Sequence, residues 1–415
     1  MNITKQAKLE EIYGENVKSR KRFLELKEKF KETYLWDKAE FFSAPGRTEL
    51  IGNHTDHNGG LVIAGSINMD TIGAAFTNGE DKVRITSEGY DREIVIDLMN
   101  LGADKNGHGK TEDLVMGMLE GIVKAGFHVS GFDAYITTEV ISAAGVSSSA
   151  SFEMLLCSMV DYFFNDGAMS YVDYAKAGQY AENRYWGKAS GLMDQLACAV
   201  GGTILLDFAE LECPVYQKLD FSFHDIGYQM VIVNTGKGHA DLSMEYSDIP
   251  MEMAQAGAVL NVGRLCGAEL GDLLEHITEI ENDRAVLRSL HFYQENERVK
   301  GTVKAIEKKD RQEFLRLIRE SGISSWEWLQ NCYSIQDVTE QKVPLVLALT
   351  DLFLKRIGDG ACRVHGGGFA GVIMCLVPEK EAFHYIDYIS GFVGCGSVYP
   401  MDIRSIGTVH IENIF

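Results

Sequence analysis

The sequence lacks any run of about 18 or more apolar residues, the length that a membrane-spanning helix requires. Residues 1–23, MNITKQAKLEEIYGENVKSRKRF, are charged, helical in pattern and without the apolar stretch of a secretory signal. Internal repeats and low-complexity tracts are also missing. We therefore expect a cytoplasmic protein that has no membrane partner.

Basic residues are few relative to acidic ones. Lys and Arg number 39 against 60 Asp and Glu, which gives a formal net charge of −21. This balance repels phosphate backbones and anionic membranes, so it disfavours nucleic acid and lipid partners. It does not exclude an anionic nucleotide, because backbone amides and a metal ion can create a local anion site.

Paired cysteine motifs are missing as well. None of the eight cysteines falls in a C-x-x-C pair, and most lie in apolar runs such as LLCSM and IMCLV. We expect reduced, buried thiols, and neither a zinc site nor a disulfide framework.

The composition that is present is that of a globular protein, with 46% hydrophobic and 24% charged residues. At about 150 residues per domain, the 415 residues suggest two or three domains. Periodicity predicts helices over 1–40, 111–126, 150–165, 170–187 and 193–200, and strands over 61–78, 83–97 and 132–142. Short strands follow near 205–230, then a mostly helical span over 250–356, then two apolar strands, a helix and a final strand. We expect an α+β fold whose two lobes span residues 1–215 and 216–415.

The first of three notable motifs is APGRTELIGNHTDHNGG, residues 44–60. It holds four glycines, one arginine, two acidic residues and two histidines between strand-like runs. A loop so rich in polar groups indicates a binding site held by rigid elements. A polar surface loop is the alternative.

The second motif is AAGVSSSAS, residues 143–151, between a predicted strand and a predicted helix. Small residues let backbone amides approach a ligand closely, and the helix N-terminus adds partial positive charge. Serine hydroxyls can bind phosphate oxygens or magnesium. An ordinary serine N-cap is the alternative, and the Walker A pattern is absent.

The third motif is HGGGFAG, residues 365–371, a glycine turn between two apolar strands. Three consecutive glycines cost conformational entropy, which indicates that another group approaches the backbone closely. A tight hairpin is the alternative.

Taken together, the motifs resemble those of the galactokinases, a family of the GHMP kinase superfamily. The first resembles their signature G-R-V-N-L-I-G-E-H-T-D-Y-N-G-G, the second their phosphate loop G-x-G-L-S-S-S-A, and the third their T-G-G-G-F-G-G. AENRYWGKASGLMDQ (181–195) and NTGKGHADLSMEY (234–246) are similar to two further family segments. The resemblance covers about residues 40–410 and implies a two-lobed GHMP kinase fold with the active site in the cleft between the lobes.

The resemblance implies ATP- and Mg²⁺-dependent phosphorylation of the anomeric C1 hydroxyl of galactose, giving galactose 1-phosphate. By resemblance, the carboxylate of Asp194 faces that hydroxyl, and Arg47 lies beside the same oxygen and the transferred phosphate. Because a neighbouring arginine stabilises a charged carboxylate, Asp194 either polarises the hydroxyl or accepts its proton. A sugar and ATP sensor without activity is the alternative, which the complete serine loop disfavours.

The resemblance also implies the binding residues. The nucleotide phosphates would lie on Gly145, Val146, Ser147, Ser148 and Ser149. Magnesium would bind Ser149 and Glu182, whose hard oxygens suit the ion. The sugar would contact Asn53, His54, Asp56, Asp194 and Tyr246, although Tyr246 could instead be core packing. The partners would thus be a sugar and ATP, and the chain would be a monomer or a weak homodimer.

The chain departs from the family pattern at several positions. Asn53 stands where galactokinases have glutamate, and Glu49 stands where they have asparagine. If the two side chains meet, galactose binding can survive with their roles exchanged. If they do not, the neutral Asn53, with His57 in place of tyrosine, would favour galacturonate or an amino sugar such as N-acetylgalactosamine. Ala143 and Ala370 replace glycines, but both are small and we expect ATP binding to persist.

Overall fold

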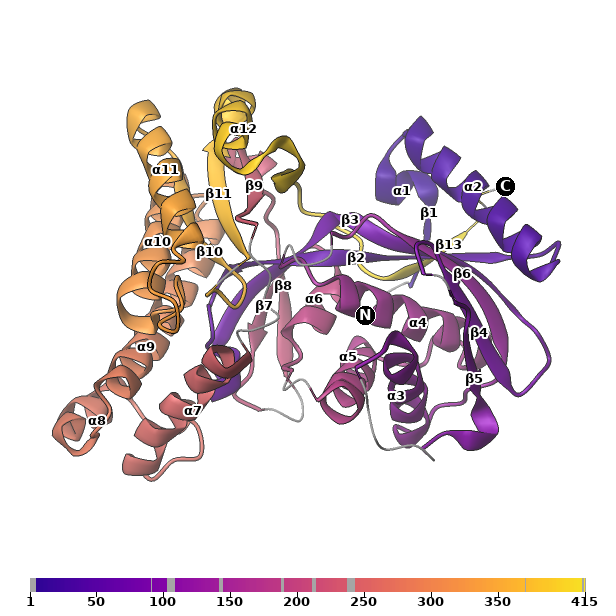
Figure 1. Cartoon of the computed structure of the whole chain (residues 1–415), viewed down its shortest axis with the longest axis horizontal. Helices are drawn as coiled ribbons and strands as arrows, with labels where there is room; N and C mark the ends of the chain where they lie inside the picture. Colours follow the sequence, from indigo (N-terminus) through magenta and orange to yellow (C-terminus); the bar gives the residue numbers. More distant parts are fainter. Residues whose placement is uncertain are drawn as a thin grey trace.

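The structure is a computed structural model, and it describes residues 5–90, 92–102, 109–141, 145–187, 190–210, 214–236, 243–369, 371–412 and 414. Two β-sheets meet near the middle of the molecule, and helices pack against both (Figure 1). The larger, nine-stranded sheet has the strand order β1-β13-β2-β3-β6-β4-β5, with β7 beside β3 and β8 beside β7. The smaller sheet has the order β10-β11-β9-β12. The predicted α+β class is confirmed.

The bounds of the elements are as follows. The strands are β1 (Gln6–Lys8), β2 (Glu40–Ile51), β3 (Leu61–Thr77), β4 (Lys82–Ser87), β5 (Ile94–Asp97), β6 (Phe132–Thr138), β7 (Thr203–Asp207), β8 (Val215–Leu219), β9 (Tyr228–Asn234), β10 (Ala361–His365), β11 (Val372–Pro378), β12 (Val398–Met401) and β13 (Val409–Glu412). The helices are α1 (Leu9–Tyr13), α2 (Val17–Tyr34), α3 (Thr111–Lys124), α4 (Ser148–Phe164), α5 (Tyr171–Ala181), α6 (Met193–Val200), α7 (Ser243–Val259), α8 (Leu270–Glu275), α9 (Asp283–Glu307), α10 (Arg311–Ser324), α11 (Lys342–Ile357) and α12 (Glu379–Val393). A π-helical turn, Glu182–Trp186, continues α5.

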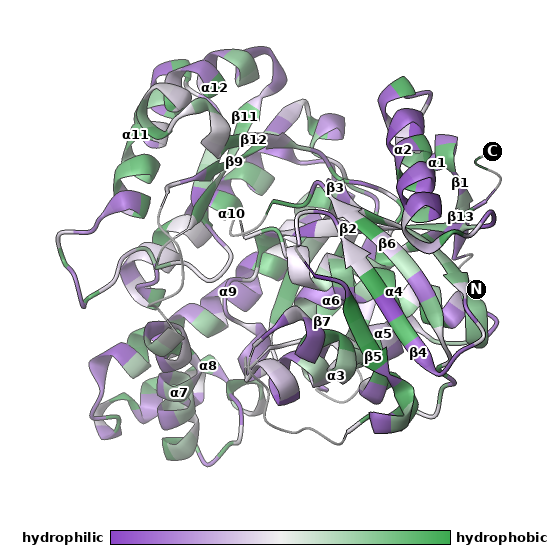
Figure 2. Ribbon diagram, turned by 45° about the vertical axis from the view of Figure 1, so that its right-hand side comes forward, coloured by the Kyte–Doolittle hydropathy of each residue, from purple (hydrophilic) through white to green (hydrophobic). Residues whose placement is uncertain are grey.

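Helices cover both faces of the larger sheet. On one face, α3, α4, α5 and α6 enclose the largest apolar core with the strands (Figure 1). On the other face, α2 packs through Phe23, Leu26 and Phe30, while the rest of this helix is mostly hydrophilic (Figure 2). This single apolar stripe is the pattern expected of a helix with one face on a sheet.

The two sheets share a second apolar core. Residues of β2, β3, β9 and β11 pack there with α9 and α10, including Leu50, Ile63, Met230, Phe314 and Met374. Helices α11 and α12 cover the other face of the smaller sheet. This shared core fixes β2, which carries the first motif, against the strands that flank the third motif.

Two pairings in the larger sheet join distant parts of the chain. Strand β13 lies between β1 and β2, parallel to β1 and antiparallel to β2. Strand β1 lies within the region predicted to be helical, because a three-residue strand formed by non-local pairing has no periodic signal. The domain boundary near residue 215 stays a prediction; β8 begins at Val215 and pairs with β7. None of the described helices combines the length and apolar character that a bilayer crossing requires.

The described cysteines are all free thiols. Cys157, Cys198, Cys332 and Cys375 are buried, as expected, but Cys266 and Cys395 are exposed. Cys213 lies outside the described residues.

Candidate active site

Arg47 and Asp194 form a two-pronged ion pair. Arg47, on β2, donates from Nε to Asp194 Oδ1 at 2.7 Å and from Nη2 to Oδ2 at 2.8 Å. Asp194 lies in the first turn of α6. Burial disfavours the charge on Arg47, but the carboxylate of Asp194 outweighs this and raises the pKa of the guanidinium. The two residues expected to act on the hydroxyl therefore lie side by side, and the arginine fixes the orientation of the carboxylate.

The second motif packs directly on this pair. Arg47 donates its backbone N–H to Val146 O at 3.0 Å and a guanidinium N–H to Gly145 O. The hydroxyl of Ser147 donates to Asp194 Oδ2. Helix α4 begins at Ser148, so its N-terminus lies next to the ion pair. An anion bound at this helix end would thus be close to both catalytic candidates.

Ser149 and Glu182 are also brought together. Ser149 Oγ lies 3.3 Å from Glu182 Oε1, and Gln195 Nε2 lies 3.5 Å from Glu182 Oε2. Glu182 is buried at the start of the π-helical turn. One hydroxyl and one carboxylate are hard oxygen donors that fit Mg²⁺. No cluster of three His, Cys, Asp or Glu side chains that could hold a metal ion occurs among the described residues.

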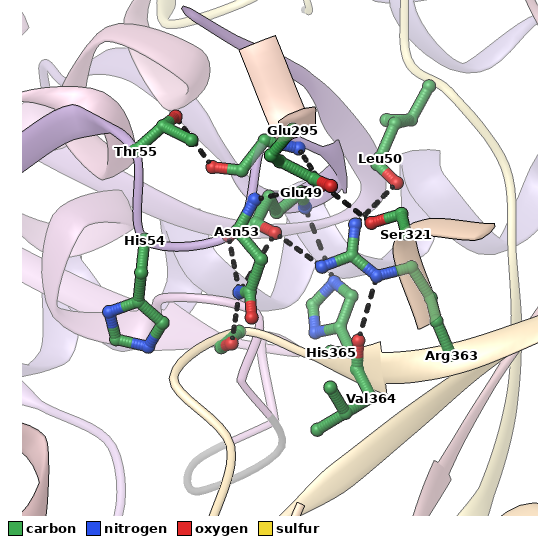
Figure 3. Close-up of polar contacts among 12 residues, drawn as sticks. Glu49, Leu50, Asn53, His54, Thr55, Glu295, Ser321, Arg363, Val364 and His365 are labelled. Atoms are coloured by element: carbon green, nitrogen blue, oxygen red, sulfur yellow. Dashed lines mark hydrogen bonds and ion pairs between the residues drawn. The ribbon is translucent and has the colours of Figure 1, made fainter. Parts of the chain in front are cut away.

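Asn53 and Glu49 do meet, and both lie inside the protein (Figure 3). Asn53 Nδ2 donates to Glu49 Oε1 at 3.2 Å and to Gly366 O at 2.7 Å. Asn53 Oδ1 accepts from Asn331 Nδ2 at 2.8 Å. Glu49 forms an ion pair with Arg363. The amide nitrogen of Asn53 therefore bonds within the first and third motifs.

The remaining sugar-pocket candidates form a cluster. The ring centroids of His54 and Tyr246 are 5.1 Å apart, and those of His54 and His57 are 5.9 Å apart. His57 Nε2 lies 3.6 Å from Asp56 Oδ1. Partial burial, and then the nearby carboxylates of Asp194, Asp56 and Glu49, raise the pKa of Tyr246. Tyr246 is 40% exposed, which favours a binding residue over core packing.

His54 itself is a neutral, fixed side chain. Its Nε2 lies 3.0 Å from Gly367 O and therefore carries the proton. Burial, followed by the charge of His57, lowers the pKa of His54 to about 3. Tyr246 lies so close to Gly367 that a Cβ there would be 1.8 Å from its ring. A side chain at position 367 would therefore displace the Tyr246 ring.

Among its described positions, each of the three motifs has a non-glycine residue in the left-handed region. These residues are His54, Ser147 and Phe369, with φ of 58°, 57° and 59°. A bulky residue adopts this conformation at a cost of about 1–3 kcal/mol, which surrounding contacts must offset. Such strain concentrates at functional sites, and here it occurs in all three loops.

A buried polar network beneath the first motif was not predicted (Figure 3). Glu295, on α9, accepts from Gly52 N at 3.1 Å, from Ser321 Oγ at 2.6 Å and from Arg298 Nε at 2.7 Å. Burial opposes ionisation of Glu295, but the charges of Arg298, His291 and Arg363 and the hydrogen bond from Ser321 together outweigh burial and lower the pKa to about 2. The sequence signal was a charged i, i+3 pair, Glu295 and Arg298, within the mostly helical span predicted over 250–356.

His365 belongs to the same network. Its Nε2 accepts from Glu49 N at 3.3 Å and lies 2.9 Å from Thr48 Oγ1. Burial, with the charges of Arg47 and Arg363, holds the pKa of His365 well below its usual range. The neutral ring thus connects the third motif to the residues that follow Arg47. Ala143, Ala370 and residues 237–242 lie outside the described residues.

Comparisons with known proteins show the family of the chain. The family model "Galactokinase galactose-binding signature" matches residues 28–76, and "GHMP kinases N terminal domain" matches residues 113–202. A galactokinase of Clostridium tetani is 31% identical over 364 residues, which cover 86% of this chain and 88% of the relative. A galactokinase of Lactococcus lactis is 32% identical over 400 residues, which cover 94% of each chain.

Solved structures of related proteins have the same fold. The crystal structure of Lactococcus lactis galactokinase complexed with galactose superposes with a TM-score of 0.81 at 26% identity, covering 94% of this chain and 100% of that one. The Methanococcus jannaschii mevalonate kinase superposes with a TM-score of 0.64 at 15% identity, covering 89% of this chain and 99% of that one. The second likeness concerns the fold alone.

Proposed function

Since the chain belongs to the galactokinase family of the GHMP kinases, we propose that it transfers the γ-phosphoryl group of ATP to the anomeric O1 of galactose. The bond between the γ-phosphorus and the β,γ-bridging oxygen breaks, and a bond between the γ-phosphorus and galactose O1 forms. The O1 proton is released, and ADP and galactose 1-phosphate leave. The chain is a sugar kinase, and the resemblance inferred from the three motifs is confirmed.

The observation that supports this chemistry best is the contact between the Arg47–Asp194 pair and the N-terminal end of α4. In-line phosphoryl transfer depends on positioning and on neutralising charge at the transferred group. The α4 N-terminus would hold the nucleotide phosphates on Gly145, Val146, Ser147, Ser148 and Ser149. Arg47 would stabilise charge on the transferred phosphoryl group, and Asp194 would orient O1–H and receive its proton.

Ser149 and Glu182 are the residues that would hold Mg²⁺ beside this loop. When bound, the ion neutralises negative charge on the nucleotide phosphates. Gln195 supports this arrangement because its amide lies 3.5 Å from one Glu182 oxygen and 3.0 Å from a Glu153 oxygen. It thereby orients the Glu182 carboxylate toward Ser149.

The sugar would lie among Asp194, Asp56, His54 and Tyr246. Carboxylates accept hydrogen bonds from ring hydroxyls with strong directionality, which distinguishes sugar epimers. Asn53 would contribute through the carbonyl oxygen of its fixed amide. Because the side chains of Asn53 and Glu49 meet, the exchange keeps one amide and one carboxylate together. Under this condition, galactose remains the substrate.

ADP release from Mg²⁺-ATP should be measured with galactose, N-acetylgalactosamine, galacturonate, arabinose and glucose. We expect turnover on galactose, a C1 phosphate product identified by phosphorus NMR, and loss of turnover in Asp194→Asn. Turnover on galacturonate alone would overturn the assigned substrate. Silence on every sugar from folded protein would overturn the kinase assignment.

A further inference from the structure

Ser147 occupies the N-cap position of α4 but does not cap the helix. A serine N-cap ordinarily has extended backbone and accepts a hydrogen bond from an amide of the first turn. Ser147 has φ 57° and ψ 62° and makes no side-chain cap. Ser170, at the same position of α5, has φ −74° and ψ 163° and accepts from Asp173 N at 3.1 Å. The hydroxyl of Ser147 instead donates to Asp194, and the backbone of Ser147 adopts the left-handed conformation.

This hydroxyl bonds to the carboxylate that the proposed reaction uses. Asp194 Oδ2 accepts from Arg47 Nη2 at 2.8 Å and from Ser147 Oγ. A carboxylate oxygen has two lone-pair sites, so these two donors fill Oδ2. A sugar hydroxyl that approaches Oδ2 must therefore replace Ser147, since the guanidinium is fixed by its second bond to Oδ1.

The same loop would hold the nucleotide. Without a serine cap, the amides of the first turn of α4 are available to an anion, and the helix dipole favours one there. The loop is tied to the ion pair at two further points, from Arg47 N to Val146 O and from the Arg47 guanidinium to Gly145 O. A phosphate that rearranges the loop would act directly on the residues around Asp194.

We propose that Ser147 couples the nucleotide site to the sugar site, an inference that rests on the proposed function. In the absence of nucleotide, its hydroxyl takes the place on Asp194 Oδ2 that galactose O1–H uses in the complex. Phosphate bound at the α4 N-terminus releases Ser147 from its left-handed conformation and from Asp194. Nucleotide then increases the affinity for galactose, and by linkage galactose increases the affinity for nucleotide by the same factor.

Calorimetric titration of galactose into the full chain, with and without a non-hydrolysable ATP analogue and Mg²⁺, measures this coupling. For the unaltered protein, we expect the analogue to lower the Kd of galactose by at least about fivefold, the lower end of usual coupling between sites. In Ser147→Ala, galactose alone should bind more tightly, and the effect of the analogue should fall to less than about twofold.

Two further variants separate the hydroxyl from other effects. Ser147→Gly also removes the hydroxyl but adopts left-handed backbone without strain, so it should lose the coupling to the same extent as Ser147→Ala. Ser170→Ala removes a true capping hydroxyl far from the site and should keep the coupling of the unaltered protein.

Equal coupling in the unaltered protein and in both Ser147 variants, or weaker binding of galactose alone to Ser147→Ala, would overturn the inference. A difference between the alanine and glycine variants would overturn it too, because the backbone rather than the hydroxyl would be responsible. Absence of ADP release with galactose from the unaltered protein would overturn the proposed function instead, and the inference with it.

Discussion

Glu49 and Arg363 form a buried ion pair that joins the two sheets, with Glu49 Oε1 2.9 Å from Arg363 Nη2. Glu49 lies on β2, and Arg363 lies on β10. The arginine also donates to Leu50 O at 3.0 Å, so its position is fixed by β2 backbone. This pair gives a physical reason for the exchange at positions 49 and 53. The carboxylate of Glu49 faces the guanidinium of Arg363, and the amide of Asn53 lies beside that carboxylate.

Glu49→Gln should lower the free energy of unfolding by about 3–5 kcal/mol, because it leaves a buried guanidinium without its counter-ion. Urea denaturation measures the change. In the double variant Glu49→Gln/Arg363→Met, the loss of unfolding free energy should be smaller than the sum of the losses in the two single variants, since neither charge of this pair remains. The exposed pair of Glu313 and Arg316 is the control, and Glu313→Gln should cost less than about 1 kcal/mol. A loss for Glu49→Gln as small as that of the control would contradict the prediction.

Asp194→Asn should lower kcat by about 10²–10⁴-fold, because the amide cannot accept the proton of O1–H. The KM for ATP reports separately on the phosphate loop, which is bonded to Asp194 through Ser147. Steady-state ADP release at varied ATP and saturating galactose measures both constants, and circular dichroism checks that the fold is kept. A folded variant that retains a tenth of the kcat would show that Asp194 is not the group that acts on the hydroxyl.

Glu182→Gln should raise the Mg²⁺ concentration required for half-maximal activity by about tenfold or more, because one charged oxygen donor is replaced by a neutral one. Activity should recover at high Mg²⁺, which a loss of folding would not allow. A Mg²⁺ titration at fixed ATP gives the half-maximal concentration, with Glu313→Gln as the control. An unchanged Mg²⁺ requirement would remove Glu182 from the ion's ligands.

The stability of the protein should fall between pH 6.5 and pH 4 in part because of His291. Its Nε2 lies 2.9 Å from Asn53 O, and burial lowers its pKa to about 4. An unfolded histidine has a pKa of about 6.5. Below that pH the unfolded chain therefore binds a proton that the folded protein does not. This group's contribution is fully present above pH 6.5 and is lost at about 1.4 kcal/mol per pH unit as the pH falls toward 4.

His291→Gln removes this titrating group while keeping an amide that can reach Asn53 O. Urea unfolding at several pH values should give a shallower decline for the variant than for the unaltered protein. Parallel declines would mean that His291 is not buried in its neutral form.

The sequence was most informative where function is concentrated in short motifs. Arg47 and Asp194 are far apart in the chain, and no periodicity links them, yet the family resemblance implied that both lie beside the same hydroxyl, and the structure places their side chains in contact. The helices and strands with a strong local pattern, such as α4 and β3, were also predicted.

The rest depended on contacts that no local pattern encodes. Arg363 appears in the sequence only as a charge within an apolar strand, and its partner Glu49 lies 314 positions away. Ser147 was predicted to bind phosphate, but its contact with Asp194 depends on a left-handed backbone that serine rarely adopts. Both features result from tertiary packing, which overrides residue preference.

The position of β13 between β1 and β2 has a consequence for synthesis of the protein. The ribosome synthesises the chain from its N-terminus, so the residues of β2 emerge long before residues 409–412 are made. Until they arrive, one edge of β2 presents unpaired N–H and C=O groups, and such an edge invites pairing with other chains. The edge of β2 at residues 41–43 is therefore covered only when translation is almost finished.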